Sequence, residues 1–475
     1  AGVTNAATNG SSITIDNNPQ GAGFLLISPS APEDKKYPYF TMNFTTRAFN
    51  EGVPRDETWQ YMGAPGNNAT FKNLNSQTLI YHWDETTGWT PYTVNGSLPT
   101  WNGYALTQSI NTNHTYNITA QAMQGSQTIN LTRTEEGMKG DNLFVNSFTA
   151  PIDITKIDPT TDVTGDWDYQ TFYLFNTGSW NDWQGVNPDN KHDASSPGHY
   201  YTIPILSAQY LDDAQTVIPP MQGVYVHTEA PATITLDYSK HVWNGTPDNT
   251  PMRAPQKQSP DFRRIRIQAS SQNSGADRMY IIQESSTTRG YDNGYDGKNI
   301  NAKGQVNIYT NEPFGKMEVS CANNIDSMYI GFRAGSDSQY QLTFGSLVGD
   351  SLYLKDLNDN TIIRMEEGGI YHFFAEPNSV NHSRFQILLH PSEVAGDNTT
   401  TGDHQICQAK IWIDHQYLYI TDAPIASQAI IYAISGQRVA SYTVNDSYYT
   451  IPLSSLNSGI YILQINNQRY KFVWK

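Results

Sequence analysis

The sequence is poor in cysteine. Its 475 residues include two, Cys321 and Cys407, and neither belongs to a CxxC pair. Two thiols cannot build a disulfide framework, and neither has a nearby histidine pair, which argues against a zinc or redox site. The sequence leaves open whether the two cysteines pair with each other.

Basic residues and long apolar runs are also scarce. The chain has 29 Lys and Arg against 45 Asp and Glu, a net charge of −16. Such a surface repels phosphate backbones and anionic membranes, so we expect no nucleic-acid partner. No run of about 18 apolar residues occurs, and we expect no transmembrane segment. The chain begins at Ala1 without a charged and then apolar leader, as expected of a mature or trimmed form.

Aromatic and turn-forming residues are abundant instead. Aromatic residues reach 12%, with 30 Tyr and 10 Trp, and the chain has 35 Gly and 25 Pro. Apolar and polar residues alternate over five to eight positions, with almost no helical spacing, which predicts short β-strands separated by turns. The predicted fold class is all-β, with tandem jelly-roll-like β-sandwich domains and a small C-terminal immunoglobulin-like sandwich.

Proline-rich and Asn/Thr-rich stretches suggest where the domains divide. Residues 243–260 contain four prolines, a composition that disfavours sheet pairing and is typical of a linker. We therefore predict an N-terminal β-rich region over residues 1–252, with a subdivision near residue 140, and a β-sandwich domain over 253–392. A linker over 393–404 then leads to a last module over 405–475.

The last module carries an ordered series of short motifs. Residues 431–439 have the pattern of a strand, a turn glycine and a basic residue, and 451–453, 456–463 and 471–475 follow. This set resembles the C-terminal sorting domain of proteins exported by the bacterial type IX secretion system. The resemblance implies the secretion machinery as a partner, passage through the outer membrane to the cell surface, and often removal of the module. It assigns the sorting signal to Gly436, Arg438, Gly459, Tyr461, Lys471 and Lys475.

The region upstream resembles surface proteins that carry the same module. The matching stretches include residues 142–153, 172–178, 218–226 and 291–297. Most members of that set have no assigned activity, and some are described as adhesins. The resemblance implies a secreted protein for adhesion or structural ligand display, without catalytic activity. Carbohydrate binding is the alternative, and a glycan-acting hydrolase is a further one.

No catalytic motif supports an enzyme. The sequence has no GxSxG, HExxH or Walker A motif. A glycosidase needs only two carboxylates that the fold brings together, so sequence spacing does not exclude one. The candidates are Asp166, Asp168, Asp182, Asp212 and Asp213, although acidic residues in Asn-rich loops are more often solvated turn residues.

Two loops contain residues that metals prefer. Glu284, Asp292 and Asp296 offer hard oxygen ligands, so calcium is the candidate ion, although turn geometry alone also favours Asp and Gly there. His192 and His199 flank a Ser-Pro-Gly loop and could pair over a metal, but we expect a solvent-exposed pair.

Tryptophan-rich loops are the preferred candidates for ligand binding. An exposed indole beside Asn and Asp can stack on a sugar ring or anchor a protein partner. The expected ligand is a host or environmental glycan or protein. We expect most of the tryptophans, including Trp83, Trp89, Trp101 and Trp167, to pack in the core. The predicted exposed site is Trp180, Asn181, Asp182 and Trp183.

Overall fold

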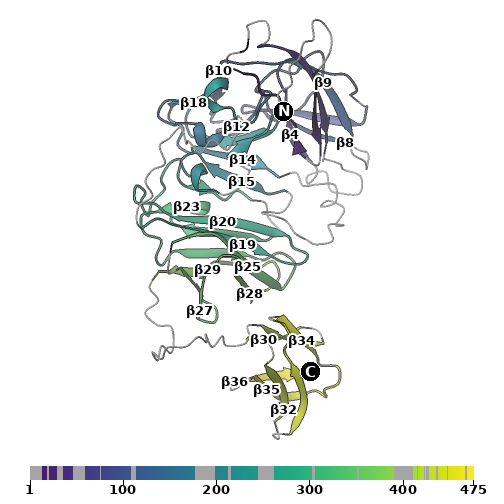
Figure 1. The fold of residues 1–475 in the computed structure, drawn as a ribbon, viewed down its shortest axis with the longest axis vertical. Coiled ribbons are helices and arrows are strands. Elements are labelled where there is room, and N and C mark those ends of the chain that lie inside the picture. Colours follow the sequence, from purple (N-terminus) through teal and green to yellow (C-terminus); the bar gives the residue numbers. More distant parts are fainter. Residues whose placement is uncertain are drawn as a thin grey trace. The chain divides into compact units, whose positions relative to one another are not determined.

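The computed structural model consists almost entirely of β-strands, which confirms the all-β prediction. The chain divides into two compact units, Ala1–Ser392 and Glu393–Lys475, each described here by itself (Figure 1). The structure describes residues 13–18, 21–28, 31, 36–46, 59–74, 76–108, 114–176, 198–211, 216–243, 261–301, 305–349, 352–389, 410–414, 416–421, 423, 427–434, 437–446, 448–465 and 468–474.

The first part of the upstream unit contains two mostly antiparallel sheets. One has the order β2-β1-β3-β9-β5 and the other β4-β8-β6-β7. In β3, every second side chain is buried, the pattern of a strand with one face on a core. The strands are β1 (Ile13–Asn18), β2 (Gly21–Ala22), β3 (Tyr39–Thr45), β4 (Gln60–Met62), β5 (Asn67–Phe71), β6 (Thr78–Asp84), β7 (Gly88–Pro91), β8 (Tyr104–Gln108) and β9 (Thr115–Gln121).

Three further sheets follow before residue 243. Their orders are β10-β18-β13, β11-β17-β14-β15 and β12-β16. They share one hydrophobic core with the first two sheets, which runs in sequence from Ile15 to Val242. The strands are β10 (Ser126–Leu131), β11 (Asp141–Val145), β12 (Ile152–Asp153), β13 (Val163–Gly165), β14 (Thr171–Phe175), β15 (Tyr200–Pro204), β16 (Val217–Ile218), β17 (Gly223–His227) and β18 (Ala232–Asp237). The short helices are η3 (Ile154–Lys156), η4 (Ala208–Tyr210) and α2 (Tyr238–His241).

The second part of this unit is one large mixed sheet with its own core. The order is β27-β26-β29-β24-β22-β23-β20-β19-β25-β28, with β21 also paired to β23. Phe373 on β28 and Phe385 on β29 lie far apart in this order, yet their ring centroids are 5.1 Å apart. The sheet therefore folds back on itself around a shared core, as in a sandwich. The strands are β19 (Arg263–Ser270), β20 (Ala276–Gln283), β21 (Gly297–Lys298), β22 (Asn307–Glu312), β23 (Gly315–Ala322), β24 (Tyr329–Arg333), β25 (Gln339–Val348), β26 (Tyr353–Asp356), β27 (Thr361–Arg364), β28 (Ile370–Phe374) and β29 (Val380–Leu388).

A small apolar cluster joins the two parts. Tyr210, from the end of η4, packs with Phe262, and both belong to a cluster with Tyr280, Val319 and Cys321. In Figure 1, β14 and β15 lie next to β23 and β20, and β15 contacts β21 and β23. This contact fixes the sheet that contains β14 and β15 against the large sheet that contains β20 and β23.

The C-terminal unit is a small two-sheet sandwich. Its sheets have the orders β30-β31-β34 and β33-β32-β35-β36. Leu418, Ile431 and Leu463 are buried between them, so both sheets contribute to one core. This arrangement agrees with the expected immunoglobulin-like sandwich. The strands are β30 (Lys410–Asp414), β31 (Tyr417–Thr421), β32 (Gln428–Ala433), β33 (Arg438–Thr443), β34 (Tyr448–Pro452), β35 (Gly459–Ile465) and β36 (Gln468–Trp474). Among the residues described, no helix has the length and hydropathy to cross a membrane.

Candidate ligand-binding surface

Two tryptophans on the β6–β7 hairpin begin a continuous aromatic cluster. Trp83 and Trp89 are direct cross-strand partners, and their ring centroids lie 5.0 Å apart in an edge-to-face arrangement. Trp89 also lies 5.6 Å from the ring of Tyr61 on β4. Trp89 is 37% exposed, so the hairpin presents an indole to solvent.

The cluster continues onto the sheet that contains β14, β15 and β17. The ring of Tyr61 lies 5.0 Å from that of Phe175, which is the cross-strand partner of Tyr200. Tyr200 in turn lies 5.9 Å from Tyr225. We call the six residues Tyr61, Trp83, Trp89, Phe175, Tyr200 and Tyr225 the aromatic surface.

Strand alternation explains why these rings face away from the core. On β17, Tyr225 is half-buried between the fully buried Val224 and Val226. Because successive side chains point to opposite faces, the two valines fill the core and Tyr225 lies on the outer face. Gly223 on the same strand allows Tyr61 to approach, since a Cβ there would lie 2.5 Å from the Cβ of Tyr61.

Polar groups border the aromatic surface. The Tyr225 hydroxyl donates to Asp141 Oδ1 at 2.7 Å, and His227 Nδ1 lies 2.6 Å from the same oxygen. The hydrogen bond to Asp141 raises the pKa of His227, and Glu229 at 3.2 Å from Nε2 adds to the effect. Carboxylate, imidazole and hydroxyl groups are thus held at the border of the aromatic surface.

The predicted tryptophan loop begins and ends at this surface. Strand β14 ends at Phe175 and β15 begins at Tyr200, both members of the aromatic surface. The predicted site residues Trp180, Asn181, Asp182 and Trp183 lie between them, outside the described residues. Their role in ligand binding stays a prediction.

The tryptophans differ in burial from one another. Trp167 is 1% exposed and its indole donates to the carbonyl of His227, as expected of a core residue. Trp89 was expected in the core, and its exposure corrects that expectation. Asp84 and Gly88 are cross-strand partners at the turn of this hairpin, and Gly88 is buried. Because successive residues of a strand point to opposite faces, the next residue, Trp89, lies on the exposed face. A Cβ at Gly88 would lie 3.3 Å from the side chain of Met138, which is distant in sequence.

One of the two described hydrolase candidates, Asp168, lies at the border of the same region. Asp168 Oδ1 accepts a hydrogen bond from the backbone N–H of Glu229 at 2.9 Å, and Asp166 is exposed. The other three candidates, Asp182, Asp212 and Asp213, lie outside the described residues. Asp168 therefore serves a structural contact between two loops.

The three predicted calcium ligands each have separate hydrogen-bond partners. Glu284 Oε2 accepts from the Tyr210 hydroxyl at 2.9 Å, and Asp292 Oδ2 accepts from the Thr288 N–H at 2.6 Å. Asp296 accepts from the N–H groups of Cys321 and Asp292, both at 2.7 Å. Across the described ranges, no group of three or more His, Cys, Asp or Glu side chains is placed to hold a metal ion. Calcium binding stays a prediction for this loop.

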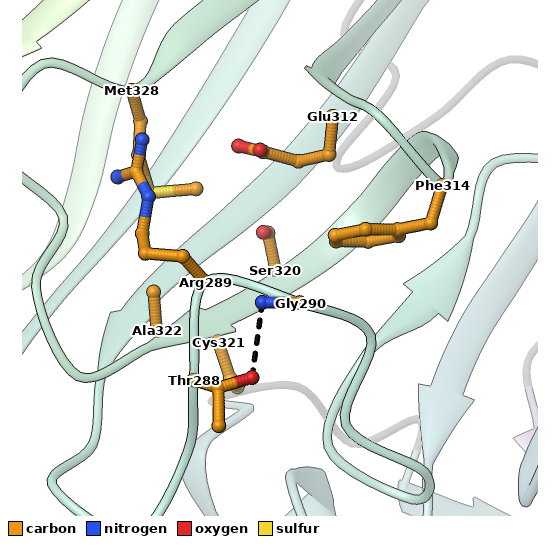
Figure 2. Close-up of a pocket in the computed structure, with 9 residues that line it drawn as sticks. All are labelled: Thr288, Arg289, Gly290, Glu312, Phe314, Ser320, Cys321, Ala322 and Met328. Carbon is orange, nitrogen blue, oxygen red and sulfur yellow. Dashed lines mark hydrogen bonds between the residues drawn. The ribbon is translucent and has the colours of Figure 1, made fainter.

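A small pocket lies next to this loop (Figure 2). The Glu312 carboxylate points toward the side of the pocket on which the Arg289 guanidinium lies, with Phe314 on the opposite side. Burial raises the pKa of Glu312, and the charge of Arg289 opposes this effect. Arg289 Nη1 also donates to the carbonyl of Asn324 at 3.0 Å. Cys321 lines the pocket and is buried. Cys407, the other cysteine of the chain, lies outside the described residues.

A largely buried polar cluster lies where β15 meets β23. Glu318 Oε2 accepts from the Thr202 hydroxyl at 2.7 Å, and Asn301 Nδ2 lies 3.1 Å from Asp277 Oδ1. Burial raises the pKa of Glu318 to about 8, and the charge of Asp277 contributes to the shift. His199 lies here with Nδ1 3.3 Å from Asp277 Oδ1 and is completely buried. This corrects the expectation of an exposed histidine; His192 lies outside the described residues.

The residues predicted to form the sorting signal occupy different environments in the C-terminal unit. Tyr461 packs against Phe472 with ring centroids 5.5 Å apart, and its hydroxyl donates to the carbonyl of Asn457 at 2.6 Å. Arg438 and Lys471 are exposed, and Gly459 begins β35. Gly436 and Lys475 lie outside the described residues.

Most of the chain is similar in sequence to a known protein. The chain is 27% identical over 416 residues to the minor fimbrium subunit Mfa5 of Porphyromonas gingivalis, an alignment that covers 79% of this chain and 33% of that protein. The chain thus spans about a third of the length of this curated relative. No solved structure matches the chain. Residues 411–475 match the family described as secretion system C-terminal sorting domain. The match confirms the resemblance to the type IX module, and the chain is therefore a secreted cell-surface protein that carries a C-terminal sorting domain.

Proposed function

We propose that the upstream unit is an adhesive or structural ligand-display component of the cell surface and has no catalytic activity. The observation that carries the proposal is the combination of a sorting domain with similarity to a fimbrium subunit over most of the chain. Export places the upstream unit outside the cell, where a rigid β-scaffold can present loops and side chains to a partner.

The contacts of the acidic residues support a non-catalytic role. Asp141 is engaged by Tyr225 and His227, and Asp168 by the backbone of Glu229. An inverting or retaining glycosidase needs two carboxyl groups that face each other across the sugar. These carboxylates instead stabilise neighbouring strands and loops.

A second candidate function, carbohydrate binding, is favoured by the aromatic surface. The exposed ring of Trp89 can stack on the apolar face of a sugar, while Asp141 and Glu229 can accept its hydroxyls. The surface continues to Phe175 and Tyr200, where the loop with Trp180 and Trp183 leaves and returns.

Binding of the purified full chain to arrays of glycans and of host proteins tests both candidates. We expect Trp89→Ala to reduce a reproducible signal at least tenfold. Tyr39→Ala is the matched control, since Tyr39 is exposed and lies on β3, outside the aromatic surface. Glycan binding lost only in Trp89→Ala supports carbohydrate binding, whereas protein binding alone supports protein adhesion. Equal binding by both variants would exclude the aromatic surface as the site.

A further inference from the structure

The β33-β32-β35-β36 sheet of the C-terminal unit has one face that packs on the core and one outer face. On β35, Tyr461, Leu463 and Ile465 are buried in the core. Because side chains alternate, Ile460 and Ile462 lie on the opposite face. On β36, Phe472 is buried, and Val473 and Lys471 lie on the outer side.

Cross-strand pairing gathers apolar residues on this outer face. Ile460 is the direct partner of Val473, and Tyr432 is the partner of Ile462. Ile434 lies in the turn directly after β32, one residue beyond the pair Ala433–Tyr461. Ile434 is 71% exposed and Val473 51% exposed. We call Tyr432, Ile434, Ile460, Ile462 and Val473 the outer apolar face.

Such a face is unusual for a sheet with one solvated side. An antiparallel sheet that packs on a core through one face normally has polar residues on the other. A cluster of exposed aliphatic side chains costs free energy in water and promotes aggregation, so it usually marks an interaction surface. The outer apolar face therefore has the composition of a contact surface and not of a free surface.

Two residues expected to belong to the sorting signal border this face. Lys471 is the cross-strand partner of Ile462, and Arg438 is the partner of Tyr432. Both side chains are exposed. The buried Tyr461, by contrast, supports the core. The cationic residues of the signal and the apolar side chains thus form one continuous surface.

We infer that the outer apolar face is the surface by which a protein of the secretion machinery binds the sorting domain. The partner would present apolar side chains rimmed by carboxylates, complementary to Ile434 and Val473 and to the flanking Arg438 and Lys471. A sorting domain must be recognised on the cargo to which it is attached, so its recognition surface has to be available in the full chain. The inference is independent of what the upstream unit binds.

Export from the native bacterium tests the inference. In the full chain, Ile434→Ser together with Val473→Ser should lower the extracellular amount at least tenfold, with the protein retained inside the outer membrane. The matched control is Tyr417→Ser, an exposed residue on the other sheet of the same unit. Thermal unfolding of both variants should agree with the wild type, because neither change touches the core. Normal export of the double variant would overturn the inference.

Site-specific photocrosslinking identifies the occupant. A photoreactive phenylalanine analogue placed at position 434 of the full chain should give an adduct with a component of the secretion system, identified by mass spectrometry. An analogue at position 417 is the control and should not give that adduct. A crosslink at 434 only to a second copy, or only to the upstream unit of the same chain, would contradict the assignment. Loss of ligand binding by the purified chain would bear on the proposed function and leave this result unchanged.

Discussion

Trp83 and Trp89 face each other across the β6–β7 hairpin with ring centroids 5.0 Å apart and ring planes at 67°. This pair fixes the position of an exposed indole, because edge-to-face packing adds about 0.5–1.5 kcal/mol beyond area burial. Trp83 is further held by a hydrogen bond from its indole N–H to the carbonyl of Asp141 at 2.8 Å. The exposed ring is therefore preorganised by a second, less exposed one.

Two tryptophan variants should separate binding from stability. We expect Trp167→Ala to lower the free energy of unfolding by roughly 3–5 kcal/mol, because it empties a fully buried site. Trp89→Ala should cost less, about 1 kcal/mol, since this ring is partly exposed. Denaturant unfolding of the full chain measures both. Similar losses in the two variants would contradict the assigned difference in burial.

Gly223→Ala should disturb the aromatic surface through the backbone. A Cβ at this position would lie 2.5 Å from the Cβ of Tyr61, closer than packed carbon atoms allow, so β17 and β4 would have to separate. We expect a loss of about 1–3 kcal/mol in the free energy of unfolding, as is typical of overpacking, and weaker ligand binding. Gly125→Ala is a control with no atom within 4 Å of the added carbon, although its φ of +74° brings local strain. Stronger or unchanged binding by Gly223→Ala would contradict the role of this close approach.

The stability of the upstream unit should fall as pH rises from about 4.5 to about 8. The pKa of Glu318 is raised in the folded state, so the folded protein retains a proton that the unfolded chain has lost in this range. The contribution of this proton to the free energy of unfolding is fully present below the pKa of the unfolded state, and it is lost as pH rises through the pKa of the folded state. Asp296, whose pKa burial raises to about 7, acts in the same direction.

Glu318→Gln should remove most of this dependence, because the amide carries no charge to bury. Thermal or denaturant unfolding at a series of pH values measures the slope, and Glu366→Gln on an exposed turn is the control. A slope unchanged in Glu318→Gln would show that the buried carboxyl does not govern the pH response.

Calcium should stabilise the chain if the loop at Glu284, Asp292 and Asp296 binds the ion. The expected result is a rise in melting temperature on adding calcium and its absence in Asp292→Asn. The existing hydrogen bonds of these carboxylates to Tyr210, Thr288 and Cys321 hold the loop without an ion. Identical melting curves with calcium and with chelator would exclude calcium stabilisation through this loop.

The sequence predicts the strands better than it predicts which side chains are exposed to solvent. Alternation locates β3 and β17 because one face of each lies on a core, and the series from Ile431 to Val473 identifies the sorting domain. The exposure of Trp89 and the burial of His199 depend instead on contacts with distant segments. His199 is covered where β15 meets β23, and no local pattern shows that two parts of the chain meet there.

The aromatic surface was only partly predictable for the same reason. The loop with Trp180 and Trp183 is visible in the sequence as an aromatic cluster. Tyr61, Phe175 and Tyr225 come from three separate strands, and they come together because β14 pairs with β17 and the ring of Tyr61 packs on that of Phe175. Composition indicates an aromatic protein, but only tertiary structure brings these rings together.

Adhesion of bacteria that display the full chain tests the central claim most directly. Cells with the wild-type chain should attach to an immobilised glycan or host protein more strongly than cells that lack it, and Trp89→Ala should reduce attachment at equal surface amounts, measured with an antibody. Attachment that does not change when the chain is deleted, on every glycan and protein surface tested, would contradict an adhesive role.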